Sequence, residues 1–179
     1  SVDPHIWNDI KLWIKTVNYL NSKLGEIKEE YKEEYQKNTD VFSKELIDLD
    51  HKLTDQFNAL PDSSRIVVTA HDAFEYLGRA YDLELKRLQG FSTSAEFGIK
   101  DITVLSDFII ANNIKTIFGE TSVPNRNLQA VIDHCAEKGH TVKIGGKLYS
   151  DALGDKKSGA ETYASMMRQN ANTIIVGLK

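Results

Sequence analysis

Three side chains of a kind that binds metal ions follow strand-like runs of this sequence. His71 comes two residues after a run of Ile-Val-Val-Thr. Glu120 and Asp151 follow two further short runs rich in β-branched residues. If these runs are parallel strands, the three side chains open on one edge of the sheet, where the ligands of such sheets bind. Imidazole and carboxylate groups suit zinc and manganese, so the pattern indicates a transition-metal site.

Each of these side chains also has a purely structural interpretation, which the pattern alone leaves open. A histidine just after a strand often caps a helix or lies in a loop. Asp151 precedes Ala-Leu-Gly and could cap a turn. Glu120 could accept hydrogen bonds from backbone amides in the turn at residues 119–124. His5 stands just before a helical pattern, and taken alone it has no assigned role.

The other histidines and the single cysteine are expected to be structural. His134 and His140 flank a helix end without a partner at ligand spacing, and His51 lies on the polar side of a helical pattern. Cys135 falls on an apolar helix face, and one cysteine excludes a multi-cysteine metal cage. The chain has no glycine-rich phosphate loop, no Gly-x-Ser-x-Gly elbow and no His-Glu-x-x-His motif.

The composition is that of a soluble globular protein. The 179 residues are 41% hydrophobic and 27% charged, with a formal net charge of −4. Lysine and arginine are spread among the acidic residues, so no nucleic-acid partner is expected. The longest apolar runs are far too short to span a bilayer.

Two helical patterns occupy the first third of the chain. Residues 8–24 repeat apolar side chains every three or four positions, with Asn8 or Asp9 as the cap, and Gly25 is expected to end the helix. Residues 27–60 carry a longer pattern, and a helix of some 30 residues is about 45 Å long. That length leaves two interpretations open: a helix packed on a domain, or a strut between two lobes.

After residue 64 short strands alternate with helices. This alternation predicts an α/β fold, with a four-stranded, mostly parallel sheet, helices on both faces, and a long linking helix before it. Strands are expected at residues 65–69, 83–90, 116–118 and 141–144, and helices at residues 73–81, 102–109, 125–137 and 159–178.

Five segments, in order and in register, resemble motifs of the zinc and manganese solute-binding proteins of bacterial ABC importers. In that family, the cluster A-I metal-binding lipoproteins, the wording is closest to the treponemal-type branch. Asp-Pro-His-Ile-Trp at residues 3–7 resembles an Asp-Pro-His-x-Trp motif, and residues 118–124 resemble a Glu-x-Ser-x-Pro turn. The remaining matches are Val-Thr-Ala-His-Asp-Ala-Phe at 68–74, the loop at 89–96, and the final motif at 145–154.

The resemblance implies two lobes joined by one long rigid helix, with the metal between them. Residues 1–26 are then the end of the N-terminal lobe, 27–60 the interdomain helix and 61–179 the C-terminal α/β lobe. The family's fourth ligand, a histidine of the N-terminal lobe, has no counterpart, which makes the chain resemble a C-terminal portion. We therefore expect an open site, a loosely held His5, and weak or no metal binding by these 179 residues.

The resemblance also implies the ligand set. His5, His71 and Asp151 are the expected metal ligands, and Glu120 or Asp72 is expected to orient His71 through its other ring nitrogen. His71 favours zinc, or dual use of zinc and manganese, because manganese-specialised relatives tend to carry Glu at that position. Asp151 favours manganese, because many zinc-specialised relatives leave that position to water. The metal, zinc or manganese, is the transported ligand, and no catalytic residue is expected.

The function implied is capture of a transition-metal ion outside the cytoplasm and its delivery to the membrane subunit of an ABC importer. Such a protein is a monomer in the periplasm or on the outer face of the cytoplasmic membrane, and it is not an enzyme. Two alternatives stay open. One is a metal-dependent hydrolase, and the other is a surface adhesin that uses the long helix as a stalk and has no transport role.

Overall fold

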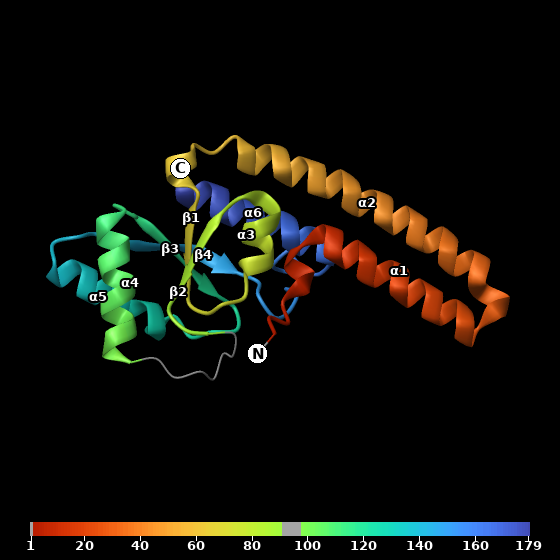
Figure 1. Cartoon of the computed structure of the whole chain (residues 1–179), viewed down its shortest axis with the longest axis horizontal. Helices are drawn as coiled ribbons and strands as arrows, with labels where there is room; N and C mark the ends of the chain where they lie inside the picture. Colours follow the sequence, from red (N-terminus) through yellow and green to blue (C-terminus); the bar gives the residue numbers. More distant parts are fainter. Residues whose placement is uncertain (1, 91–97) are drawn as a thin grey trace.

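The protein consists of an α/β body from which a pair of antiparallel helices extends (Figure 1). The computed structural model describes residues 2–90 and 98–179. The expected loop motif at residues 89–96 therefore lies, from residue 91 on, outside the described residues. No helix of the described part combines the length and the apolar character that crossing a bilayer requires.

The two extended helices are α1 (Ile10–Ile27) and α2 (Lys32–Asn58), joined through one short 3-10 turn at Glu29–Tyr31. Asp9 caps α1, because its side chain accepts a hydrogen bond from the backbone amide of Leu12. The expectation that Gly25 ends α1 is wrong, because Gly25 lies inside this helix. A Cβ there would stand 3.3 Å from Cγ of Lys32, so glycine lets the two helices approach closely at the turn.

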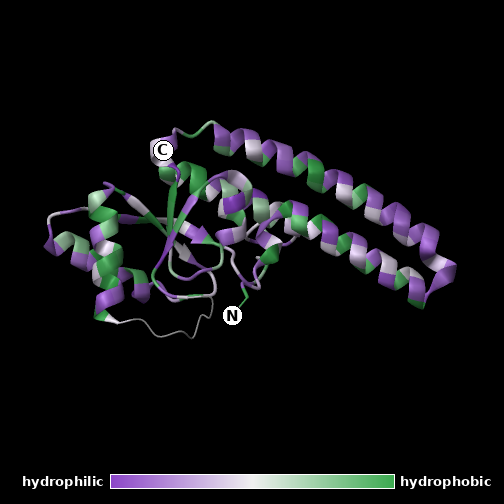
Figure 2. Cartoon of the chain, in the orientation of Figure 1, coloured by the Kyte–Doolittle hydropathy of each residue, from purple (hydrophilic) through white to green (hydrophobic). Residues whose placement is uncertain are grey.

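The long helix α2 has 27 residues and changes character along its length. Its C-terminal half buries Leu46, Leu49, Leu53 and Phe57 against the α/β body. Full burial of each such side chain contributes about 1.5–3 kcal/mol of transfer free energy. The outer half is mostly hydrophilic and projects beyond the body (Figure 2). The long helix is thus confirmed, although it begins later than the apolar pattern indicates.

The four expected strands are present, in two hydrogen-bonded pairs. β1 runs parallel to β2, and β3 runs parallel to β4, while β1 and β3 lie next to each other. The expected α/β class is confirmed, but a single continuous four-stranded sheet is not formed in the described residues. The strands are β1 (Ile66–Thr69), β2 (Glu84–Arg87), β3 (Thr116–Glu120) and β4 (Lys143–Leu148).

Helices cover both faces of the strand layer, as expected. Because side chains alternate along a strand, Val67 and Phe118 join the core under α2, α3 and α6, while Val68 and Ile117 join the core under α4 and α5. The helices after α2 are α3 (Glu75–Tyr81), α4 (Ile99–Ala111), α5 (Arg126–Glu137) and α6 (Tyr163–Leu178).

The last helix begins four residues later than the sequence indicates. Gly159 adopts φ = +69°, a left-handed conformation that cannot continue a right-handed helix. Thr162 supplies the cap instead, since its hydroxyl accepts a hydrogen bond from the amide of Ser165 at 3.2 Å. The segment between β4 and α6 therefore stays irregular, and it carries Asp151.

Candidate metal site

Three expected ligands from distant parts of the chain meet beyond the carboxyl ends of the strands. His5, His71 and Asp151 each offer a donor atom, and these atoms all lie within 4.8 Å of one another. Nε2 of His5 lies 3.3 Å from Oδ1 of Asp151, and Nε2 of His71 lies 3.6 Å from Oδ2. This is the edge of an α/β fold where ligands bind, and the donor set suits a transition metal.

His71 lies in the loop at the carboxyl end of β1. It follows β1 by two residues and has no exposed surface. Nδ1 of its ring lies 2.5 Å from Oε2 of Glu120, the last residue of β3. The other oxygen of Glu120 accepts hydrogen bonds from the backbone amides of Ala70 and His71, both at 2.9 Å. One buried carboxylate thus fixes both the backbone and the ring of His71, and leaves Nε2 facing Asp151.

The charges around His71 favour a cation at this position. Burial alone lowers the pKa of His71, but the hydrogen bond and the negative charge of Glu120 raise it, and Asp151 and Asp72 add to the rise. The pKa therefore lies above its usual value of 6.5. A site that stabilises a proton on a buried imidazole offers the same negative potential to a metal ion.

His5 has a support of the same kind that the sequence reasoning missed. Oδ1 of Asp3 lies 2.8 Å from Nδ1 of His5 and also accepts a hydrogen bond from the His5 amide at 2.9 Å. The expectation that His5 is loosely held is wrong, because the residue is only 2% exposed. The Asp-Pro-His order, with the carboxylate two residues before the imidazole, was the signal available.

Asp151 differs from both histidines because a third of its side chain is exposed. It therefore marks the open side of the cluster. Its Oδ2 accepts a hydrogen bond from the hydroxyl of Ser150 at 3.1 Å. The hydroxyl of Ser150 also lies 2.6 Å from that of Ser122, which follows β3. These contacts tie the Asp151 segment to the segment after Glu120.

Of the two residues expected to orient His71, only Glu120 contacts its ring in this structure. Asp72 is buried, but its Oδ2 lies 2.9 Å from Nε of Arg87 on β2. Burial raises the pKa of Asp72, and the charge of Arg87 opposes that rise. Asp72 therefore belongs to an ion pair beside the cluster.

The histidines and the cysteine that were set aside lie away from the cluster. Nε2 of His140 is 2.7 Å from the carbonyl oxygen of Ile114, and His134 lies 3.6 Å from Glu137. His51 is exposed on α2. Cys135 is fully buried in the core under α4 and α5, and burial raises the pKa of its thiol.

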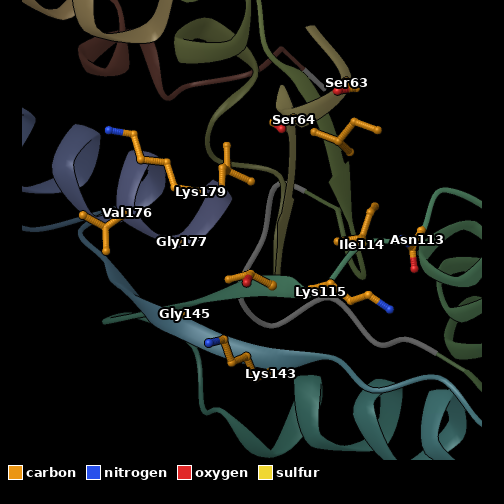
Figure 3. A pocket seen from close by; sticks show the side chains of 13 residues that line it. Ser63, Ser64, Asn113, Ile114, Lys115, Lys143, Gly145, Val176, Gly177 and Lys179 are labelled. Carbon is orange, nitrogen blue, oxygen red and sulfur yellow. The ribbon is translucent and has the colours of Figure 1, made fainter. Parts of the chain in front are cut away.

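The opposite edge of the strand layer offers no alternative metal site. A cavity of about 450 Å³ opens there, at the amino ends of β1, β3 and β4 (Figure 3). Its lining includes Lys115, Lys143 and Lys179 and contains no histidine, cysteine or carboxylate side chain. Lysine ammonium groups repel a cation, so of these two edges, as far as the described residues form them, the carboxyl edge has the required chemistry.

Three candidate ligands come together within the described residues. Zinc in a protein usually takes four ligands in a tetrahedral arrangement. If His5, His71 and Asp151 held a zinc ion, a fourth position would be left for water or for a group outside these residues. Both histidines turn Nε2 toward Asp151 and have a carboxylate at Nδ1, the arrangement that fixes ligand tautomers around metals.

Known proteins resemble the chain along its whole length. The manganese-binding lipoprotein MntA of Bacillus subtilis is 40% identical over 179 residues, which are 100% of this chain and 58% of that protein. The zinc-binding protein TroA of Treponema pallidum is 38% identical, over 98% of this chain and 57% of that protein. The solved structure of the TroA periplasmic zinc-binding protein superposes with a TM-score of 0.94, covering 98% of this chain and 64% of that one.

The chain therefore spans less than two thirds of the length of these relatives. A family model described as zinc-uptake complex component A, periplasmic (ZnuA), matches residues 1–177. With that match added to the fold and the ligand geometry, the chain belongs to the ZnuA family of metal-binding proteins.

Proposed function

We propose that this protein captures a transition-metal ion, zinc or manganese, outside the cytoplasm and delivers it to the membrane subunit of an ABC importer. The single observation that carries the proposal is the convergence of His5, His71 and Asp151 at the carboxyl edge of the strands. Family membership supports the same role. A lipoprotein or periplasmic location fits, because the names of the relatives carry those words.

The donor set favours zinc over manganese in binding strength. Two imidazole nitrogens and one carboxylate are ligands that zinc accepts at short distances. Sites of this composition generally bind zinc more tightly than manganese. Both metals occur in the names of the relatives, manganese for MntA and zinc for TroA. We propose that both bind, with zinc the tighter.

The site serves as a carrier site and not as a hydrolytic centre. Many zinc hydrolases use a free carboxylate to take a proton from the bound water. Here Glu120 is occupied by two backbone amides and the ring of His71, and Asp151 faces both histidines. Neither carboxylate is left as a general base.

We also propose that α2 links two lobes, with α1 at the end of the N-terminal lobe. The outer part of the helix pair supports this proposal, because it exposes large apolar side chains that a second lobe would cover. Leu20 is 55% exposed and Ile27 is 72% exposed. The C-terminal half of α2 is meanwhile firmly packed in the α/β body.

Metal uptake by cells that lack the gene tests the proposed function. We expect the natural full-length protein to restore importer-dependent uptake of radioactive zinc or manganese. The His71→Ala variant should not restore it, while His51→Ala, which changes an exposed histidine on α2, should behave like the parent. Full uptake with His71→Ala would contradict the proposal.

A further inference from the structure

The strands alone do not set the relative position of His5 and Asp151, because both residues lie in irregular segments. A hydrogen bond across 143 residues of sequence joins their segments. Nε1 of Trp7 donates to the carbonyl oxygen of Ser150 at 2.7 Å. Trp7 follows His5 by two residues, and Ser150 directly precedes Asp151. This bond thus connects the backbones that carry two of the three ligands.

Trp7 is itself held from the other side by α6. The hydroxyl of Tyr163, the first residue of that helix, donates to the backbone carbonyl of Trp7 at 2.8 Å. The ring of Tyr163 stacks on Trp13 of α1, with centroids 5.4 Å apart and an interplanar angle of 23°. Burial raises the pKa of Tyr163, so its hydroxyl keeps the proton that this bond requires.

Trp7 also contacts the ligand His5 directly. The two rings meet edge to face, with centroids 5.3 Å apart and an angle of 71°. One tryptophan therefore touches the imidazole of one ligand and holds the backbone beside another. We refer to the two hydrogen bonds, Trp7 to Ser150 and Tyr163 to Trp7, as the Trp7 bridge.

Packing alone does not hold the Asp151 segment in place. A cavity of about 240 Å³ lies beside it, lined by Trp7, Trp13, Tyr163 and Leu153 among others. Leu153 is 49% exposed, and the side chain of Asp151 is one-third exposed. A segment that borders open space and exposes its side chains depends strongly on its hydrogen bonds for a fixed position.

We propose that Trp7, supported by Tyr163, is a positioning residue that sets how long the site retains its metal. This inference rests on the proposed function. The bridge keeps Asp151 within reach of the two histidines, so that all three ligands are in place before the metal arrives. Without it, the Asp151 segment moves into the adjacent cavity and the metal loses its one exposed ligand first. Loss of groups that orient ligands typically costs about 10–100-fold in metal affinity.

The rate of metal release from the natural full-length protein tests the proposal. The zinc-loaded protein is mixed with an excess of a chelator, and the appearance of the zinc–chelator complex is followed. Trp7→Phe removes the indole donor and keeps an aromatic ring beside His5. We expect this variant to release zinc about 10-fold faster, the lower end of the range for orienting groups. Tyr163→Phe removes only the supporting hydroxyl, and it should accelerate release by a smaller factor.

Tyr81→Phe is the matched control. Its hydroxyl donates to Asp50 at 3.0 Å in a buried contact, so the variant loses the same group as Tyr163→Phe, but away from the metal. The two variants should lower the thermal unfolding temperature of the metal-free protein by similar amounts. Only Tyr163→Phe should then change the release rate. This comparison separates positioning from general stability, and it holds even if Trp7→Phe does not fold.

Two results would overturn the proposal. One is an unchanged release rate in the folded bridge variants, and the other is equal acceleration by Tyr81→Phe. The proposed function would survive either result as long as the parent binds zinc and His71→Ala does not. If the parent protein bound neither zinc nor manganese, the proposed function and this inference would both be wrong.

Discussion

The two histidines of the site reach the same geometry by different means. His71 is fixed by the fold itself, since it follows β1 and is held by a carboxylate at the end of β3. His5 lies outside the strands and is held by its neighbour Asp3 and by the contacts of Trp7. Each ring nevertheless has a carboxylate at Nδ1 and turns Nε2 toward Asp151.

The difference divides the site into a permanent half, His71 with Glu120, and an adjustable half, His5 with Asp3 and Trp7. Disturbing the support of His71 disturbs the strands, because Glu120 also accepts the two backbone amides after β1. The support of His5 is local, so it can change without loss of the core. A carrier needs both qualities, because it must bind its cargo firmly and later release it. Variants of the supporting groups test this division.

Glu120→Ala should have the largest effect. It removes the acceptor of two buried amides and the partner of the His71 ring, so the free energy of unfolding should fall by about 2–4 kcal/mol. Zinc affinity should fall by about 100-fold. Chemical denaturation of the metal-free protein and calorimetric titration measure the two effects. Glu137→Ala, an exposed change on α5, is the control. A Glu120→Ala protein as stable as the parent would contradict the account.

Asp3→Ala should have an intermediate effect and should separate affinity from stability. The carboxylate orients the ring of His5 but accepts no hydrogen bond from a strand. Zinc affinity should fall by about 10-fold, while the midpoint of denaturation of the metal-free protein stays close to that of the parent. Equal losses of stability in Asp3→Ala and Glu120→Ala would remove the distinction between the two halves.

Asp72→Asn should have the smallest effect on metal binding. Its carboxylate pairs with Arg87 and does not orient the ring of His71. We expect a change in zinc affinity of less than about 3-fold, since the ligand geometry is retained. Calorimetry under the conditions used for Glu120→Ala provides the comparison. A loss as large as that of Glu120→Ala would mean that Asp72 orients His71 when metal is bound.

The sequence predicted the part of the site around His71 better than the part around His5. Short β-branched runs place His71 and Glu120 at strand ends, and parallel strands bring such ends together whatever the details of packing. The role of Trp7 was not predicted, because its bond to Ser150 joins segments 143 residues apart and leaves no local pattern. The motif at residues 3–7 indicated that this segment belongs to the site, but it did not indicate the hydrogen bond from Trp7 to Ser150.

The bounds and pairing of helices and strands also depend on contacts that local sequence patterns do not predict. Apolar spacing predicted the long helix, but not that Gly25 would lie inside α1, where close approach to Lys32 favours it over a larger residue. The spacing also predicted four strands, but not their division into two pairs, which depends on how β1 and β3 lie next to each other. The expectation that the 179 residues alone bind metal weakly stays a prediction, and a sub-micromolar zinc dissociation constant would contradict it.

Calorimetric titration of zinc and of manganese into the natural full-length protein tests the central claim most directly. The same titrations are made with His71→Ala and Asp151→Ala, and with His51→Ala as the control on the exposed side of α2. The account predicts tight binding, with zinc the stronger, which both ligand changes weaken and His51→Ala leaves unchanged. Binding that is absent, or indifferent to His71 and Asp151, would mean that the cluster is not the metal site of this protein.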